Sequence, residues 1–355
     1  PDKCIQCNSC AFVCPHAAIR PFLLTAEEAE KAPAGLKKAQ GKAVLKEYSF
    51  ALSVSVDDCT GCGNCVDVCP AKEKALTMVS ALDQHSEQDN FNWLATKVGY
   101  KDTVVNKAAN VKNSQFAQPL FEFSGACAGC GETPYIKNIT QLFGDRMMIA
   151  NATGCSSIYG ASFPASPYCT NAQGHGPAWQ NSLFEDNAEF GLGMKIGSDR
   201  ARETVANLMT AALDCDKCPD EVKALFRQWL ENKENGEITR EVADKVIPLM
   251  EKTDCPHCKK LLDYKHFIPA RSQWIFGGDG WAYDIGYGGL DHVLASGKNV
   301  NVLVLDTEVY SNTGGQSSKS TPAGAIAKFA ASGKKIRKKD LGMMAISYGY
   351  VYVAQ

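Results

Sequence analysis

Cysteines form the clearest chemical pattern in this sequence of 355 residues, which contains 16 of them. Two runs share the spacing Cys-x2-Cys-x2-Cys-x3-Cys-Pro. They comprise Cys4, Cys7, Cys10, Cys14 and Pro15, and Cys59, Cys62, Cys65, Cys69 and Pro70. Soft thiolates gathered by one compact loop suit iron–sulfur clusters. Zinc sites normally use two Cys-x-x-Cys pairs, and disulfides are typical of exported proteins, whereas no signal peptide is visible here. The repeat therefore favours iron–sulfur clusters over both alternatives.

The repeat matches the pattern of bacterial two-cluster ferredoxins, in which the fourth cysteine of each run binds the other cluster. The sequence thus predicts two 4Fe–4S clusters. Their ligands would be Cys4, Cys7, Cys10 and Cys69 for one cluster, and Cys59, Cys62, Cys65 and Cys14 for the other. We expect residues 1–79 to form a small α+β domain of this kind. It would contain a capping box at Thr25 and Glu28 and a strand within residues 48–56. A polar linker, residues 80–118, would follow.

A third cysteine group comprises Cys127, Cys130 and Cys155, and a cluster bound there would need a fourth ligand. Cys155 follows a predicted buried strand, residues 146–150. Open α/β sheets bind their ligands at the carboxyl ends of such strands. Buried structural thiols are an alternative for Cys155, but they fit the glycine-flanked Cys127 and Cys130 poorly. Cys169 has no comparable spacing and is expected to be a free thiol.

A glycine-rich turn follows the apolar stretch that begins at Gln273. Gly277, Gly278 and Gly280 surround Asp279, and a predicted helix (284–295) and strand (299–305) complete a βαβ unit. Such a turn lets phosphate oxygens approach the backbone, but it does not match the dinucleotide-binding fingerprint. Asp279 offers a hard oxygen to Mg²⁺, and Thr307 with a backbone carbonyl of the next loop can add two more. The turn therefore predicts a diphosphate site held by Mg²⁺.

Two further Cys-x-x-Cys pairs, Cys215 with Cys218 and Cys255 with Cys258, lie on either side of predicted helices at 222–230 and 238–250. This spacing resembles that of a zinc ribbon and predicts a structural Zn²⁺ site. A helical hairpin with four reduced thiols is an equally good interpretation of the sequence.

The composition excludes some partners. There are 37 Lys and Arg against 39 Asp and Glu, so a formal charge of -2 gives no overall field for nucleic acid or an anionic membrane. No uncharged apolar run reaches the length of a membrane span, and the reduced thiols predict a cytoplasmic protein. The basic segment 334–340 is either a solvated surface or a docking patch for an acidic ferredoxin or for coenzyme A phosphates. Because the chain begins at Pro1 without Met and stops at Gln355 after an apolar run, we expect a piece of a larger protein.

The Gly-Asp-Gly turn and the later run from Asp306 to Gln316, Asp-Thr-Glu-Val-Tyr-Ser-Asn-Thr-Gly-Gly-Gln, resemble the thiamine diphosphate domain of the pyruvate:ferredoxin (flavodoxin) oxidoreductases. The ferredoxin-like repeat upstream strengthens the resemblance, which covers nearly the whole chain. It implies the carboxyl-terminal part of such an enzyme, with an α/β fold. The doubly wound thiamine diphosphate domain would occupy residues 119–355, incomplete at its end, with a helical insertion at about 200–262.

The resemblance also implies roles for individual residues. Asp279, Thr307 and the Val309 carbonyl would bind Mg²⁺. The residues in contact with thiamine diphosphate would be Glu132, Cys155, Gly278, Asp279, Gly280, Trp281, Thr307, Glu308, Val309, Tyr310, Ser311 and Asn312. Asn312 would lie near the reacting carbons. Cys127, Cys130 and Cys155 would bind a third 4Fe–4S cluster whose fourth ligand lies beyond Gln355.

The implied activity is oxidative decarboxylation of pyruvate to acetyl-CoA and CO2, with electrons passing through three 4Fe–4S clusters to ferredoxin or flavodoxin. Thr307 stands where most thiamine enzymes have Asn, which favours this branch over decarboxylases. In the family, the glutamate that activates thiamine and the residues that bind the substrate carboxylate lie in amino-terminal domains absent here. The chain alone is therefore expected to be inactive, and the enzyme to be a homodimer. Oxidoreductases for other 2-oxo acids and a purely electron-transferring iron–sulfur subunit are the alternatives.

Overall fold

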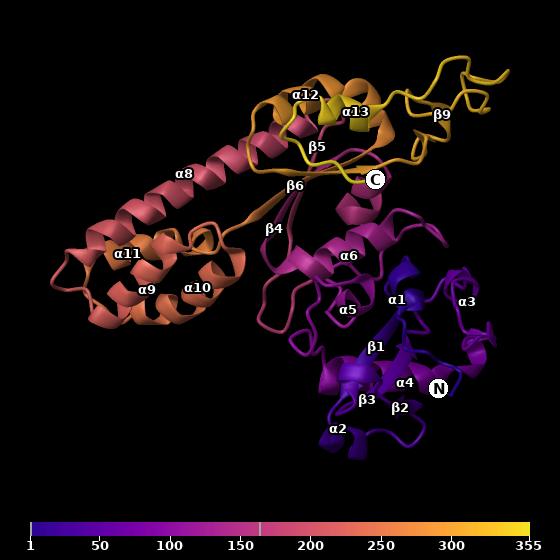
Figure 1. Cartoon of the computed structure of the whole chain (residues 1–355), viewed down its shortest axis with the longest axis horizontal. Helices are drawn as coiled ribbons and strands as arrows, with labels where there is room; N and C mark the ends of the chain where they lie inside the picture. Colours follow the sequence, from indigo (N-terminus) through magenta and orange to yellow (C-terminus); the bar gives the residue numbers. More distant parts are fainter. Residues whose placement is uncertain (1, 163–164) are drawn as a thin grey trace. The chain divides into compact units, whose positions relative to one another are not determined.

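The computed structural model describes residues 2–162 and 165–355, and it divides into two compact units. The first unit comprises Pro1–Asp145 and Ile158–Pro177, and the second comprises Arg146–Ser157 and Ala178–Gln355. Figure 1 shows the elements of both units in sequence colours. None of the helices in the described ranges is long and apolar enough to cross a membrane.

The first unit contains a three-stranded antiparallel sheet in the order β1-β3-β2. Its strands are β1 (Ile19–Leu24), β2 (Lys38–Gln40) and β3 (Ser49–Val54). The register pairs Ile19 with Val54 and Leu24 with Ser49, so the predicted strand within residues 48–56 is confirmed. The sheet connects the two cysteine runs, because Cys14 shortly precedes β1 and Cys59 shortly follows β3.

The helices of the first unit pack against this sheet or against one another. They are α1 (Ser9–Val13), α2 (Ala26–Glu30), α3 (Asn64–Asp67), α4 (His85–Trp93), α5 (Val111–Ser114) and α6 (Thr133–Phe143). The capping box predicted at the start of α2 is confirmed: the Glu28 N–H donates to Thr25 Oγ1 (3.3 Å), and the Thr25 N–H donates to Glu28 Oε2 (2.7 Å). Helix α4 lies in the segment predicted as a linker. Phe91 of α4 and Leu94 just after it pack against Phe22 of β1, which ties this segment to the sheet.

The second unit is built on a four-stranded parallel sheet in the order β5-β4-β6-β7. Its strands are β4 (Met147–Ala152), β5 (Ala178–Ser182), β6 (Ser272–Gly278) and β7 (Asn301–Leu305). The strands predicted at 146–150, after Gln273 and at 299–305 are thus confirmed. The strand order reverses between β4 and β6, and the loops that follow these two strands meet at this switch point, where open parallel sheets bind ligands.

Helices cover the sheet and complete the expected α/β fold. They are α7 (Cys155–Ser157), α8 (Asn187–Leu213) and α12 (Tyr287–Ala295). Helix α8 packs on β4 and β6, and Gly191 allows the close approach, because a Cβ atom there would lie 2.5 Å from Ile275 Cγ1. Helix α12 connects β6 to β7, which confirms the predicted βαβ unit.

Three more helices lie at the far end of α8, away from the sheet (Figure 1). They are α9 (Asp220–Glu231), α10 (Gly236–Met250) and α11 (Pro256–Asp263). With the end of α8 they enclose a separate apolar core around Phe226, Trp229 and Val246. We call this part of the second unit the helical arm. The helices predicted at 222–230 and 238–250 are confirmed.

After β7 the chain forms β8 (Val309–Tyr310), β9 (Gln316–Ser317) and α13 (Leu341–Ile346). Short 3-10 or π-helical turns lie at Ala43–Leu45, Ala81–Asp83, Leu94–Val98, Gly144–Arg146, Ile158–Ser162, Lys265–Phe267 and Gly280–Ile285.

Candidate functional site

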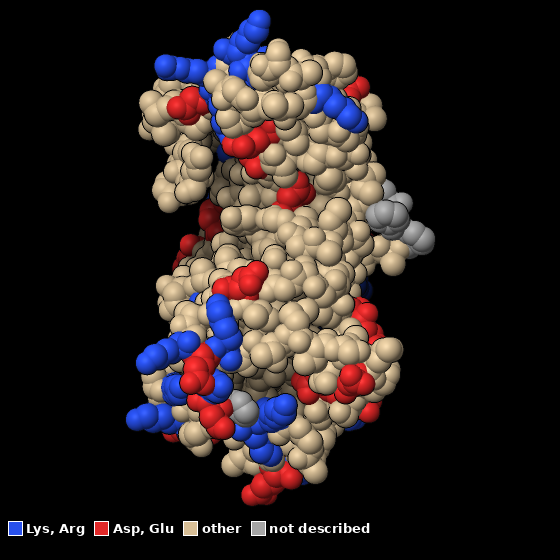
Figure 2. Space-filling model, turned by 90° about the vertical axis from the view of Figure 1, so that its right-hand side faces the viewer, with Lys and Arg blue, Asp and Glu red and all other residues tan. Residues whose placement is uncertain are grey.

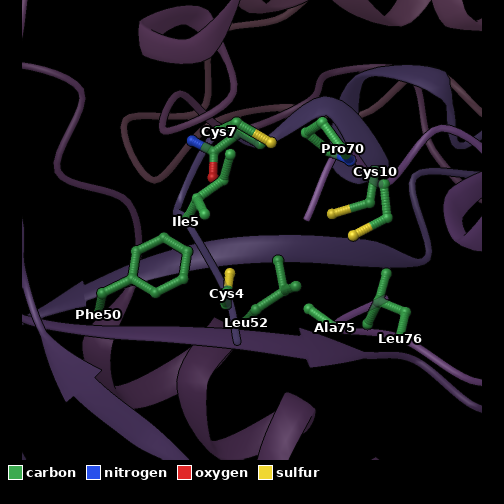
Figure 3. A pocket seen from close by; sticks show the side chains of 11 residues that line it. Cys4, Ile5, Cys7, Cys10, Phe50, Leu52, Pro70, Ala75 and Leu76 are labelled. Carbon is green, nitrogen blue, oxygen red and sulfur yellow. The ribbon is translucent and has the colours of Figure 1, made fainter. Parts of the chain in front are cut away.

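The first four predicted cluster ligands line one pocket of the first unit. Its cysteines are Cys4, Cys7, Cys10 and Cys69. Figure 3 shows the sulfur atoms of Cys4, Cys7 and Cys10 facing a common space, with Leu52 and Pro70 at its border. Three of these cysteines come from the first run and one from the second. The structure therefore brings together the crossed set that the sequence spacing predicts.

The second set lines another pocket of the same unit. Its cysteines are Cys14, Cys59, Cys62 and Cys65. Ile19, Val54 and Met78 add apolar walls. Gly61 and Gly63 have φ values of 69° and 84°, in the left-handed region that favours glycine, so the backbone can turn tightly between these cysteines. Apolar walls around a cluster limit its contact with solvent, which is one of the factors that set its reduction potential.

Two amide side chains that the sequence analysis missed hold the first cysteine loop. Gln6 and Asn8 both have a φ of 60°, in the left-handed region. Gln6 Nε2 donates to the Gln40 carbonyl (2.8 Å), and Asn8 Nδ2 donates to the Lys112 carbonyl (2.9 Å). Both are buried, and their partners are distant in sequence. Only the tertiary structure could identify them as positioning residues.

Lys137 is a third residue that the sequence analysis missed. Its side chain is buried, and Nζ donates to the carbonyls of Ala11, Phe12 (2.8 Å) and Cys14 (3.3 Å). Burial lowers the pKa of Lys137 to about 8. The lysine thus satisfies the last carbonyls of α1 and places a basic group next to Cys14, a predicted cluster ligand.

The third cysteine group is divided between the units. Cys127 and Cys130 form a turn in the first unit, where the Cys130 N–H donates to the Cys127 carbonyl (3.1 Å), and Cys155 is the first residue of α7 in the second unit. Glu132, just before α6, is buried and accepts a hydrogen bond from the Tyr159 hydroxyl (2.8 Å), and both of these residues belong to the first unit.

Three predicted Mg²⁺ ligands converge at the carboxyl edge of the parallel sheet. Thr307 Oγ1 lies 3.3 Å from Asp279 Oδ1 and 3.1 Å from the Val309 carbonyl oxygen. Neighbouring oxygens of an octahedron with 2.1 Å metal–oxygen bonds lie about 3.0 Å apart, close to both distances. Asp279 is 2% exposed, burial raises its pKa, and Oδ2 accepts no hydrogen bond within the described ranges. This donor set fits Mg²⁺.

The predicted thiamine-binding turn is tightly packed against the loop after β7. Trp281 is fully buried, and a Cβ atom on Gly280 would lie 2.3 Å from Tyr310 Cε1. Tyr310 in turn donates to Asp284 Oδ2 (3.0 Å). Only glycine therefore fits at position 280. Asn312 lies exposed in the turn between β8 and β9.

Comparisons with known proteins match both the region of the two cysteine pockets and the region of the Gly-Asp-Gly turn. Residues 3–73 match the family described as "4Fe-4S dicluster domain", and residues 262–355 match "Thiamine pyrophosphate enzyme, C-terminal TPP binding domain". The whole chain is 61% identical to a pyruvate-flavodoxin oxidoreductase of Klebsiella pneumoniae and 56% identical to a pyruvate:ferredoxin oxidoreductase of Moorella thermoacetica. The chain belongs to the family of pyruvate:ferredoxin and pyruvate-flavodoxin oxidoreductases.

The family membership confirms the resemblance that the Gly-Asp-Gly turn and the loop after β7 predicted. The chain spans about 30% of the length of these relatives, 30% for the Klebsiella enzyme and 31% for the Moorella enzyme. A pyruvate dehydrogenase [NADP(+)] of Euglena gracilis is 50% identical over the whole chain, which covers 20% of that relative. Relatives with different named electron acceptors thus share this region.

The basic segment 334–340 packs against the loop that follows β7. Lys338 forms ion pairs with Asp306 (2.7 Å) and Glu308 (3.2 Å), and Lys334 Nζ donates to the carbonyls of Ser318 (2.6 Å) and Thr321 (2.7 Å). These two lysines therefore neutralise and brace the loop. The face drawn in Figure 2 shows Lys and Arg side chains interspersed with Asp and Glu.

Proposed function

We propose that this chain provides the thiamine diphosphate site and the electron relay of an enzyme that oxidatively decarboxylates pyruvate to CO2 and transfers the acetyl group to coenzyme A. The observation that carries the proposal is the convergence of Asp279, Thr307 and Val309 at the sheet edge, in a chain that also gathers two sets of four cysteines. The two modules correspond to the two halves of the reaction, which are decarboxylation and electron transfer.

The residues of the second unit would bind and orient the cofactor. Asp279, Thr307 and the Val309 carbonyl would hold Mg²⁺ and, through it, the diphosphate. The other residues proposed to contact thiamine diphosphate are Glu132, Cys155, Gly278, Gly280, Trp281, Glu308, Tyr310, Ser311 and Asn312. Thiamine supplies the carbanion-stabilising chemistry. Trp281 is buried and Gly280 packs against the Tyr310 ring, so both would help to exclude water from the cofactor site. Exposed Asn312 is the residue proposed to reach the substrate.

Electrons would leave one at a time through iron–sulfur clusters. The balanced reaction converts pyruvate, coenzyme A and two oxidised one-electron acceptors into acetyl-CoA, CO2, a proton and two reduced acceptors. Two 4Fe–4S clusters would occupy the two cysteine pockets of the first unit. Cys127, Cys130 and Cys155 would bind a third, with a ligand from outside this chain. Ferredoxin or flavodoxin would collect the electrons.

The whole enzyme would contain further domains. Its relatives are about three times as long as this chain, and we propose that such domains bind the substrate carboxylate and activate thiamine. We also propose that domain boundaries lie at residues 79 and 118. The whole enzyme would be a homodimer, and this chain alone would be inactive. Cluster-binding thiolates need a reducing compartment, so we propose the cytoplasm.

The test is acceptor reduction by the full-length enzyme, purified without oxygen. We expect flavodoxin or ferredoxin reduction that requires both pyruvate and coenzyme A, with thiamine, iron and sulfide all present. Faster reduction with 2-oxoglutarate would assign another 2-oxo acid as the substrate. Iron and sulfide without bound thiamine would contradict the proposal and indicate an electron-transfer subunit.

A further inference from the structure

The helical arm contains four cysteines outside the matched family regions. Cys215 and Cys218 lie in the turn between α8 and α9, and Cys255 and Cys258 lie at the start of α11. Cys218 is 4% exposed, and Cys255 and Cys258 are fully buried. Cys218, Cys255 and Cys258 belong to the apolar core of the arm, and Cys215 packs against it. Nothing in the proposed reaction uses them.

The sulfur atoms of these cysteines have the spacing of ligands around one ion. Cys218 Sγ lies 3.9 Å from Cys258 Sγ, and Cys215 Sγ lies 3.6 Å from Cys255 Sγ. The sulfurs of Cys218, Cys255 and Cys258 all lie within 4.8 Å of one another. A tetrahedron with 2.3 Å zinc–sulfur bonds has edges of about 3.8 Å. These separations also exceed a disulfide bond of about 2.05 Å by a wide margin.

The backbone around these thiols is arranged as two tight turns. The Cys218 N–H donates to the Cys215 carbonyl (3.0 Å), and the Lys259 N–H donates to the Cys255 carbonyl (3.1 Å). Thr253 connects the two turns, because its Oγ1 donates to the Lys217 carbonyl (3.1 Å) and accepts from the Cys255 N–H (3.2 Å). Both cysteine pairs are therefore held in place by bonds independent of an ion.

A single ion fits this geometry better than a cluster does. A cubane carries iron and sulfide between its cysteine ligands, so its thiolates must stand further apart than those around one ion. Within the described ranges, no three cysteines of the two ferredoxin-like runs have sulfurs within 4.8 Å of one another, whereas three cysteines of the arm do. The arm thus differs from the cluster pockets in the way expected for a mononuclear site.

We infer that Cys215, Cys218, Cys255 and Cys258 bind one structural Zn²⁺ ion as a tetrathiolate. The ion joins the turn after α8 to the start of α11, two segments about forty residues apart in sequence that close the core of the arm. Zinc has no redox chemistry, so the site stays separate from the electron path.

The test counts metals in the full-length enzyme, purified without oxygen and washed with EDTA. Wild type should retain about one zinc per chain, and Cys258→Ser should retain less than about a tenth of that, with iron unchanged. Cys169→Ser is the matched control, because Cys169 lies in the other unit and should leave the zinc in place. Zinc-edge X-ray absorption should show four sulfurs at about 2.3 Å.

A second variant covers the case in which Cys258→Ser fails to fold. Cys215 is only partly buried, and Cys215→His should keep the zinc while the absorption spectrum changes to three sulfurs and one nitrogen. Wild type without zinc, loss of iron instead of zinc in Cys258→Ser, or four sulfurs retained in Cys215→His would each overturn the inference.

Discussion

Thr307 is one of the three proposed Mg²⁺ ligands, and its hydroxyl contacts the other two. It lies between Asp279 and the Val309 carbonyl, and Ser311 Oγ is 2.5 Å away. Thr307→Val keeps the shape and removes this oxygen. We predict that thiamine diphosphate binding in the presence of Mg²⁺ weakens at least about tenfold, as expected for a lost contact of about 1.4 kcal/mol.

Cofactor titration of the apoenzyme, followed by tryptophan fluorescence, checks this prediction. Ser317→Ala is a suitable control, because Ser317 lies on β9, beyond the predicted contact loop. Equal affinity of Thr307→Val and wild type would show that the hydroxyl is no ligand.

Lys137 provides a second prediction for a single residue. Lys137→Met leaves the carbonyls of Ala11, Phe12 and Cys14 without this donor in a buried position. We predict a loss of about 3 kcal/mol in the free energy of unfolding of the first unit, because unsatisfied buried acceptors are costly. Faster release of iron in urea would be the readout. Lys31→Met, at an exposed surface ion pair, should change the release rate little.

At the scale of elements, glycine allows α8 to approach the sheet. Gly191→Ala would place a Cβ atom 2.5 Å from Ile275 Cγ1, whereas Gly197→Ala in the same helix meets nothing within 4 Å. We predict that Gly191→Ala costs about 1–3 kcal/mol of stability and that Gly197→Ala stabilises by up to about 1 kcal/mol. Thermal unfolding of the two variants distinguishes these effects. Equal transition temperatures would contradict the packing argument.

Elements defined by local patterns could be predicted from the sequence, and long-range contacts could not. The cysteine sets follow from spacing within each run, and the βαβ unit follows from apolar stretches and glycines. Helix α4 was not predicted, because the hydrophilic residues 83–89 dominate its start. Phe91 near its end and Leu94 just after it are the apolar residues that pack it against the sheet. Lys137 and Asn8 have partners more than 100 residues away, so no local signal marks them.

At the scale of the molecule, the proposed Mg²⁺ ligands lie in the second unit and the two cysteine pockets lie in the first. Cys62→Ser removes one proposed ligand of the second cluster in the first unit. We predict a loss of about one to four iron atoms per chain and little remaining flavodoxin reduction, with thiamine content unchanged. Loss of thiamine together with iron would contradict this independence of the two modules.

The most direct test of the central claim is the thiamine diphosphate content of Asp279→Asn in the full-length enzyme, measured together with iron. Asp279 is the buried oxygen ligand proposed to hold Mg²⁺, and asparagine preserves its shape. We predict that bound thiamine diphosphate falls below about a tenth of the wild-type amount while iron stays constant, since a neutral amide holds Mg²⁺ far more weakly. The exposed Asp263→Asn should retain both. Wild-type thiamine content in Asp279→Asn would contradict the account.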